Sequence, residues 1–324
     1  MTMLKVGVSA LFNPADTPHA RTFLRAMCVA RNFIPALAQV QWHFLDDGAN
    51  RVRAGQVAEQ MVAADVDLVI GHFSSDAAVS AAPVYRQSGI PLLTPAATID
   101  CLTQDHHNVF RFCPSDRQLT RDLLGWIAVK GWQTLHISAD HSAHGQALAK
   151  GIARAARDYG IHQTDEREQA QVEVFAGRLR SSREHWQRRR AQGSQRPLIL
   201  TDDAASPYLG NAAADDCNTW VIGFGNAEAE AEAQPCPGTL QYKALFGTAA
   251  ETAPETYYRE SLLLFHVLGE LASRNCRRAE LLHVLNHTTF NTPLGDVSFD
   301  QGERRGAFNN LWRVGPQGLE AISE

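Results

Sequence analysis

Hydroxyl-bearing residues follow two consecutive apolar runs in the first third of the chain, and they are the side chains best suited to chemistry. Ser74 and Ser75 come after the run Asp67–Gly71 (DLVIG) and open a helical pattern, while Thr98 follows the next run, Ile90–Thr94 (IPLLT). If both runs are parallel strands, both turns lie at the carboxyl edge of one sheet, where such sheets bind ligands. Hydroxyls and N–H groups at the start of a helix bind anions. We therefore expect an anion site at this edge.

A backbone carbonyl adds a second kind of contact to this site. Pro95 shapes the turn after the second run and leaves the carbonyl of Ala96 available to an ammonium group. The residues thus favour a carboxylate site with an ammonium acceptor beside it. The alternative is that Ser75 and Thr98 are only helix N-caps, a common role of Ser and Thr at helix starts.

Signatures of catalysis are missing from the sequence. It has no GxSxG nucleophile elbow and no GxxxxGK[ST] phosphate loop. The segment 223–228 (GFGNAE) resembles a dinucleotide-binding loop, but Glu228 stands where the third small residue belongs. His283 and His287 lack the intervening glutamate of zinc peptidases. We expect no enzyme activity, no cofactor and no metal, and an enzyme on the same architecture is the alternative of a different class.

Composition and charge exclude several further classes. The 324 residues suffice for about two domains, and 44% of them are hydrophobic, as in globular proteins. With 30 Lys and Arg against 35 Asp and Glu, the net charge of −5 offers no chain-wide basic field to attract nucleic acid. No stretch approaches the roughly 18 apolar residues of a membrane-spanning helix. The six scattered cysteines form no CxxC pair, so we expect reduced thiols.

Apolar runs alternate with helical patterns along most of the chain, which is typical of βαβ units on a parallel sheet. The first group of expected strands is 4–11, 40–45, 67–71 and 90–94, with helices at 19–33, 52–64 and 77–87. The second group has helices at 118–130 and 145–159 and strands at 134–138, 197–201 and 220–223. Helices at 254–273 and 278–285 and a hairpin-like stretch at 295–322 complete the chain. The fold class is therefore α/β, with two doubly wound parallel-sheet domains.

An arginine-rich stretch lies within the second group. Residues 178–196 contain seven arginines and Trp186. Charge runs usually face solvent, so the pattern favours a solvated helix face anchored by Trp186. Docking to an acidic partner or to RNA is the alternative.

The segment Ile70–Thr98, IGHFSSDAAVSAAPVYRQSGIPLLTPAAT, resembles the signature of the leucine/isoleucine/valine-binding proteins, which are type I periplasmic binding proteins. Further agreement follows in the same order along nearly the whole chain. It comprises Asp46-Asp47, Val109–Arg111 (VFR), Gly145–Ala149 (GQALA) and Thr292–Asp300 (TPLGDVSFD).

This resemblance implies two lobes, joined by three hinge crossings, that close on a ligand. The N-terminal lobe would hold residues 1–114 and 241–301, and the C-terminal lobe residues 115–240 and 302–324. In relatives that bind amino acids, the positions matching Ser75 and Thr98 hold the α-carboxylate. The carbonyl matching Ala96, together with acids near the first crossing and in the second lobe, holds the ammonium group, and Asp116 falls near such an acid.

The sequence departs from the family pattern at several ligand positions. His144 stands where relatives commonly have a tyrosine, and it could hydrogen-bond the ligand. The aromatic residue that often caps the side-chain pocket is missing, and His19 or Phe12 lies nearest. Asp203 and Phe224 mark the second-lobe loops expected to contact the ligand.

The resemblance implies non-enzymatic binding of a small amino acid, amide or related carboxylate. Because no secretion signal is visible, we expect a cytoplasmic ligand sensor that acts on a regulator protein, if Met1 is the natural start. The alternative is the periplasmic binding component of an ABC importer with its signal peptide removed, whose partner would be a permease. No nucleic acid and no membrane insertion are expected.

Overall fold

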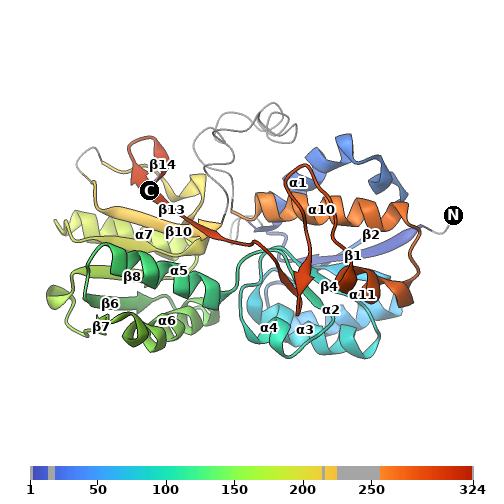
Figure 1. The fold of residues 1–324 in the computed structure, drawn as a ribbon, viewed down its shortest axis with the longest axis horizontal. Coiled ribbons are helices and arrows are strands. Elements are labelled where there is room, and N and C mark those ends of the chain that lie inside the picture. Colours follow the sequence, from blue (N-terminus) through green and yellow to red (C-terminus); the bar gives the residue numbers. More distant parts are fainter. Residues whose placement is uncertain (1–2, 14–18, 214–215, 225–255, 323–324) are drawn as a thin grey trace. The chain divides into compact units, whose positions relative to one another are not determined.

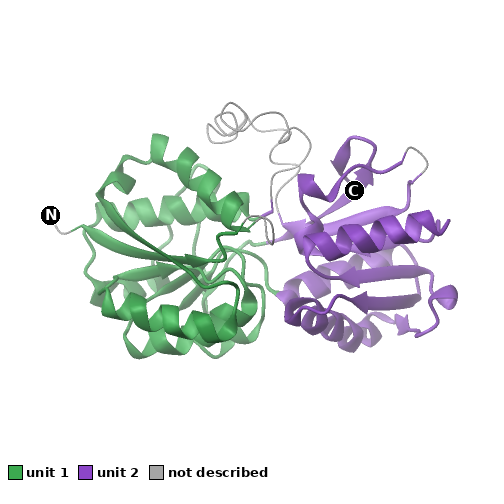
Figure 2. Cartoon of the chain, turned by 180° about the vertical axis from the view of Figure 1, so that it is seen from behind, with its two compact units in different colours: residues 1–115, 236–242, 257–307 green, residues 116–235, 243–256, 308–324 purple. Residues whose placement is uncertain are grey.

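The computed structural model describes residues 3–13, 19–213, 216–224 and 256–322. The chain divides into two compact units, coloured in Figure 2. Unit 1 contains the described residues of 1–115 and 257–307, and unit 2 contains those of 116–224, Thr256 and 308–322. The lobe boundaries expected from the sequence put residues 302–307 in the second lobe. In the structure these residues belong to unit 1, where β12 (Glu303–Arg304) pairs with β5 (Val109–Arg111). The boundary expected near residue 241 lies outside the described residues.

Unit 1 is built on a seven-stranded sheet of order β11-β12-β5-β4-β3-β1-β2 (Figure 1). Its remaining strands are β1 (Leu4–Ala10), β2 (Val40–Asp46), β3 (Leu68–Ile70), β4 (Leu92–Thr94) and β11 (Phe299–Asp300). All neighbouring pairs are parallel except β11 with β12. The order 2-1-3-4-5 is doubly wound, and its direction reverses between β1 and β3.

Helices cover both faces of this sheet, as Figure 1 shows. The helices of unit 1 are α1 (His19–Phe33), α2 (Arg51–Ala63), α3 (Ser75–Gln87), α4 (Cys101–Gln104), α10 (Tyr258–Ser273) and α11 (Arg278–His287), with a short η1 (Pro35–Gln39). α1 packs with α10 on one face, and α2 packs with α3 on the other. Alanines on the buried sides of α2 and α3 allow these two helices to lie close together over the strands.

Unit 2 repeats the same doubly wound order in the sheet β14-β13-β10-β9-β8-β6-β7. Its strands are β6 (Thr134–Ala139), β7 (His162–Gln163), β8 (Val172–Ala176), β9 (Leu198–Leu200), β10 (Thr219–Phe224), β13 (Asn309–Gly315) and β14 (Gly318–Ala321). Its helices are α5 (Asp116–Val129), α6 (Ala143–Ala155) and α7 (Leu179–Ala191), with the short turns η2 (Ala156–Tyr159), η3 (Arg167–Gln169), η4 (Asp202–Ala204) and η5 (Pro207–Leu209). Only β13 and β14 pair antiparallel to their neighbours.

The expected α/β class with two doubly wound sheets is confirmed. Strand β8 is the main element that the sequence analysis missed, because Glu173 interrupts its apolar run. The expected helix 254–273 is observed from Tyr258, and residues 254–255 lie outside the described part. None of the helices in the described ranges is long and apolar enough to span a membrane.

Candidate functional site

In unit 1 the turns after β3 and β4 leave the same edge of the sheet side by side. The N–H of Gly71 donates to the carbonyl of Leu93 at 2.9 Å, and the Thr94 hydroxyl donates to the carbonyl of His72 at 3.4 Å. Gly71 is required here, since a Cβ would lie 2.1 Å from the carbonyl oxygen of Ser9. The two turns therefore form one surface, next to the point where the strand order reverses.

Ser75 is the first residue of α3 and is largely buried, at 9% exposure. Ser74 occupies the N-cap position, and its side chain makes no capping bond. The first α3 amide with a backbone acceptor is that of Ala78, which donates to Ser74 at 2.9 Å. Within the described chain, the Ser75 hydroxyl and the N–H groups of residues 75–77 make no hydrogen bond, so they are available to an anion.

Thr98 lies in the loop after β4 and is 2% exposed. The helix that follows, α4, has Asp100 at its N-cap, so Thr98 is not a helix cap either. Neither the Thr98 hydroxyl nor the Ala96 carbonyl is bonded to another described residue. The N-cap alternative for Ser75 and Thr98 is therefore wrong, because neighbouring residues hold the cap positions.

A buried polar network lies directly beneath the turn that carries Ser75. His72 Nδ1 is 2.7 Å from Asp47 Oδ2, and His72 Nε2 is 3.0 Å from the Tyr85 hydroxyl on α3. The Ser9 hydroxyl donates to the same Asp47 oxygen at 3.0 Å. Burial opposes ionisation of Asp47, yet the hydrogen bond and charge of His72 lower its pKa overall. Burial, and then the charge of Asp47, raise the pKa of Tyr85, which keeps its hydroxyl a proton donor.

This network has the residue types of a hydrolase triad but not the geometry. Ser9 and Asp47 both approach the same ring nitrogen of His72, whereas a triad needs the nucleophile and the acid on opposite nitrogens. Tyr85 occupies the other nitrogen, and all four side chains are at most 1% exposed. The network is structural.

A second network holds the loop of Thr98. The Arg111 guanidinium is fully buried, and its Nη1 donates to the carbonyls of Ala97 (3.2 Å) and Ile99 (2.8 Å). Its Nε donates to Glu303 Oε2 at 3.0 Å, and its Nη2 contacts the other oxygen of Glu303. Nη2 also donates to the Thr103 hydroxyl at 3.0 Å. Arg111 thus ties the loop to β12 and α4.

In unit 2 the residues expected at the ligand site gather at the carboxyl edge of the sheet. His144 is in the first turn of α6, and its Nε2 lies 3.3 Å from Asp202 Oδ1. Asp202 is fully buried, and its other oxygen has no hydrogen-bond partner among the described residues. Asp116 and Asp203 are 8% and 4% exposed.

The charges of these acids control the protonation of His144. Burial alone would lower the pKa of His144, but the charge and hydrogen bond of Asp202, followed by the charges of Asp116 and Asp203, raise it to about 10. His144 is therefore an imidazolium at neutral pH, and the site combines it with three carboxylates.

Close backbone packing brings the strand ends of unit 2 together. A Cβ on Gly145 would lie 2.7 Å from the carbonyl oxygen of Ala176, and one on Gly223 would lie 2.3 Å from the Cβ of Ala205. Phe224 ends β10 at 3% exposure, directly after Gly223. These glycines let α6 and β10 approach the neighbouring turns.

The structure also places the two aromatic candidates near the first loop. The ring of His19 makes an edge contact with Tyr257, at a centroid distance of 4.5 Å. Phe12 instead packs against Phe44 on the edge strand β2.

The sequence indicates a second-lobe ligand loop at Asp202-Asp203, marked there by Asp203, whereas Asp202 is the residue that contacts His144. It does not predict the buried networks of Arg111 and His72, and the apolar residues beside them are the only signal of their burial.

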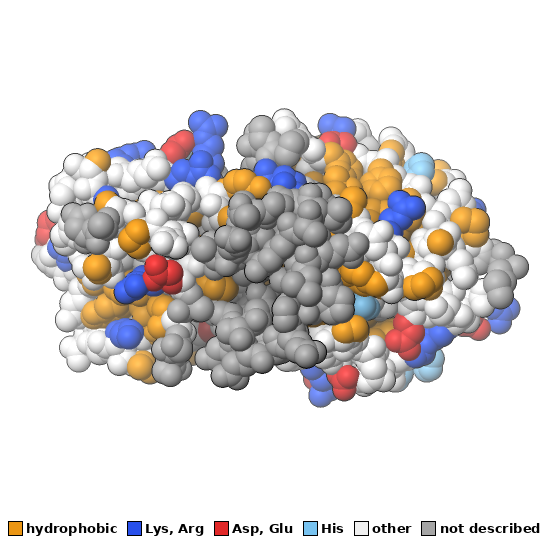
Figure 3. Space-filling view, turned by 90° about the horizontal axis from the view of Figure 1, so that it is seen from above, with side chains coloured by type: hydrophobic (Ala, Val, Ile, Leu, Met, Phe, Trp, Pro, Cys, Tyr) orange, Lys and Arg blue, Asp and Glu red, His pale blue; other side chains and the backbone are white. Residues whose placement is uncertain are grey.

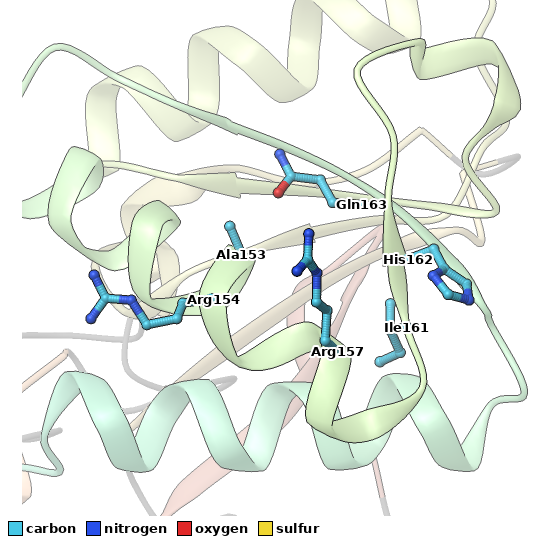
Figure 4. Close-up of a pocket in the computed structure, with 6 residues that line it drawn as sticks. All are labelled: Ala153, Arg154, Arg157, Ile161, His162 and Gln163. Atoms are coloured by element: carbon cyan, nitrogen blue, oxygen red, sulfur yellow. The ribbon is translucent and has the colours of Figure 1, made fainter.

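A surface pocket on unit 2 does not compete with this site. It lies beside the end of α6 and is lined by Ala153, Arg154, Arg157, Ile161, His162 and Gln163 (Figure 4). Arg157 points toward Gln163, whereas Arg154 points away, so the two guanidinium groups do not converge on one anion. Nor do the described residues contain a group of His, Cys, Asp and Glu able to hold a metal ion.

The arginine-rich stretch forms α7 and is held inside unit 2 to a larger extent than expected. Trp186 is buried, as predicted, but Arg189 pairs with buried Glu173, and Arg190 pairs with Asp216. The expected solvated face is therefore only partly right, because two buried acids need cationic partners. On the face drawn in Figure 3, Lys and Arg side chains are dispersed rather than gathered into one patch.

Sequence comparison agrees with this architecture. Residues 38–182 match the model of the periplasmic binding protein family. The Leu/Ile/Val-binding protein homolog 1 of Brucella abortus is 30% identical over 122 residues, which are 37% of this chain and 33% of that protein. The match thus spans about a third of the curated relative.

Solved structures match nearly the whole chain. An ABC transporter substrate-binding protein from Desulfitobacterium hafniense, in complex with Leu, has a TM-score of 0.78 at 20% identity and covers 98% of this chain and 99% of its own. A solute-binding protein of an ABC transporter from Rhodopseudomonas palustris BisB5, in complex with 3,4-dihydroxybenzoic acid, has a TM-score of 0.83 at 15% identity, covering 99% and 96%.

The fold is that of the type I periplasmic binding proteins. The resemblance to the leucine/isoleucine/valine-binding proteins is confirmed by the 122-residue match to such a relative, and the fold is shared over nearly the whole chain. The proteins compared here are named as binding proteins, not enzymes.

Proposed function

We propose that the protein is a non-enzymatic receptor that closes on a small amino acid, amide or related carboxylate. One observation carries the proposal. The hydroxyls of Ser75 and Thr98 and the first amides of α3 stand together at the ends of adjacent strands, and within the described chain none of them is bonded. Neither hydroxyl oxygen is among the described buried atoms without a partner, so both oxygens are accessible, and together with the first amides of α3 they can bind a ligand.

The chemistry of the set fits a carboxylate. A carboxylate accepts several hydrogen bonds at once, and bonds to an ionised acceptor are about twice as strong as neutral ones. The positive end of the α3 dipole adds a further attraction for an anion. The Ala96 carbonyl, also without a donor among the described residues, suits an ammonium or amide N–H beside that carboxylate.

The acids of unit 2 favour an amino acid over an ammonium-free carboxylate. Asp202 is fully buried with one unsatisfied oxygen, and it lies near Asp116, Asp203 and His144. Three carboxylates around one imidazolium attract a cationic group. Comparing leucine with 3,4-dihydroxybenzoate therefore probes the ligand class, since each is bound by a protein of this fold.

A binding screen with matched variants tests the proposal. Purified protein is titrated calorimetrically with leucine, alanine, acetamide, urea and 3,4-dihydroxybenzoate, and the measurements are repeated with S75A and T98A. Each variant should raise the Kd at least about tenfold, because losing a hydrogen bond to a charged group costs about 1.5–3 kcal/mol. Ser80→Ala, on the same helix but outside the turn, is the control and should leave Kd unchanged. Binding that is indifferent to S75A and T98A would refute the site.

For the physiological role, we propose the binding component of an ABC importer. The names of the two structural neighbours support it. The cytoplasmic sensor expected from the sequence has less support, since Arg189 and Arg190, which could have docked an acidic regulator, are paired inside unit 2. Fractionation of native cells separates the roles: recovery with the periplasm supports the importer, and recovery with cytoplasm and a soluble regulator supports the sensor.

A further inference from the structure

We propose that the two ligand-facing hydroxyls are positioned independently, each by its own buried network. Arg111 positions Thr98, and the Asp47–His72–Tyr85 network positions Ser75. This inference rests on the proposed function, because it assigns positioning residues to the same site.

The contacts of Arg111 hold the backbone on both sides of Thr98. Nη1 donates to the carbonyl of Ala97, the residue before Thr98, and to the carbonyl of Ile99, the residue after Thr98. On the other side of the loop, the N–H of Ala97 donates to the Thr94 hydroxyl at 3.0 Å. A loop fixed at these points has little freedom to turn the Thr98 hydroxyl away from a ligand.

The anchor of Arg111 is far away in the sequence. Nε and Nη2 of Arg111 both donate to the carboxylate of Glu303, and Nη2 also donates to the Thr103 hydroxyl. The Thr103 hydroxyl in turn donates to Glu303. A fully buried guanidinium without acceptors would be strongly destabilising, and here its bonds go to a carboxylate, a hydroxyl and the two carbonyls of the ligand loop. A lysine at position 111 would keep the positive charge, but it lacks the planar fork of donors that reaches all of these acceptors.

The second network holds the Ser75 turn at two points. His72 is in the turn itself, and Tyr85 is on α3, the helix that Ser75 opens. Asp47 links both to the end of β2, and its other oxygen accepts the N–H of Ala49 at 2.8 Å. Tyr85 lies in the last turn of α3, so its hydroxyl ties the far end of this helix to the turn, and the helix carries that restraint back to Ser75.

The two networks share no side chain. A long bond of 3.4 Å from the Thr94 hydroxyl to the His72 carbonyl connects them. Disturbing one network should leave the hydroxyl served by the other in place, and this separation makes the inference testable.

The test is a crossed set of double-mutant cycles, with leucine as the probe and alanine, acetamide and 3,4-dihydroxybenzoate as further probes. R111K and Y85F are each measured in the wild-type, S75A and T98A backgrounds. We expect R111K to weaken binding about five- to tenfold in wild type and S75A but less than about twofold in T98A, the size of coupling found between contacting residues. Y85F should show the reverse, losing its effect only in S75A.

The outcomes separate this inference from the proposed function. If no probe binds, or if S75A and T98A bind like wild type, the function and the inference both fail. If S75A and T98A lose affinity but R111K and Y85F act equally in all backgrounds, the function stands and the positioning roles are overturned, because a general loss of packing would not be cancelled by one hydroxyl. Should R111K not fold, E303Q replaces it, since it weakens the anchor of Arg111 and leaves the guanidinium in place.

Discussion

His144 makes a prediction about pH at the scale of a single residue. In the folded protein its pKa is raised to about 10, against 6.5 for the free side chain. Its protonated form therefore stabilises unit 2 fully below about pH 6.5, and this contribution is lost as the pH rises toward 10. We expect the melting temperature of H144Q to lie several degrees below that of wild type at pH 6, because about 1 kcal/mol corresponds to roughly 2–4 °C in proteins of this size.

The difference between H144Q and wild type should shrink steadily to near zero at pH 10. Thermal unfolding followed across this range measures it directly, and H141Q serves as the control, since His141 is exposed three residues earlier. A difference between H144Q and wild type that stays constant from pH 6 to 10 would contradict the role of the Asp202 charge.

The residues of the site divide into those visible in the sequence and those that only the fold brings together. Ser75 and Thr98 follow apolar strands directly, so their place at the sheet edge could be predicted from the pattern. Arg111 could not, because its acceptor Glu303 is 192 residues away and charged residues are normally exposed. Asp202 and Asp203 are adjacent, and only the turn η4 decides which of them meets His144.

At the scale of elements, a buried ion pair joins α7 to β8. Arg189 Nη2 lies 2.6 Å from Glu173 Oε1, and the two side chains are 11% and 3% exposed. We expect R189A to destabilise unit 2 by about 1.5–3 kcal/mol, because Glu173 loses its closest cation but keeps Arg167 and Arg196 at 3.4 Å and 3.6 Å. R180A, on the same helix but 86% exposed, should cost about 0.5 kcal/mol or less.

Urea unfolding followed by tryptophan fluorescence distinguishes these variants. Trp126, Trp132, Trp186, Trp220 and Trp312 all lie in unit 2, so the signal reports mainly on that unit. Equal midpoints for R189A and R180A would mean that the pair contributes nothing beyond a surface contact.

The same pair explains where element prediction failed. Helix α1 is observed at its expected bounds, His19–Phe33, because its apolar residues repeat at helical spacing. The run Val172–Ala176 was missed because Glu173 looked like a surface residue. Its burial depends on an arginine sixteen residues away, within a stretch whose charge suggested a solvated face.

At the scale of the whole molecule, the proposed function requires the two units to move on ligand binding. Under the proposed function a ligand shifts the population toward the state that binds it more tightly, which we propose is the closed one. A compact chain of this length has a radius of gyration of about 20 Å. We expect small-angle scattering to show the radius of gyration falling toward that value when a saturating ligand from the binding screen is added.

The double variant S75A/T98A should not contract under the same conditions, whereas S80A should contract like wild type. A radius that stays the same with bound ligand would limit the protein to binding within one unit, and closure would have to be abandoned even if the carboxylate site stands.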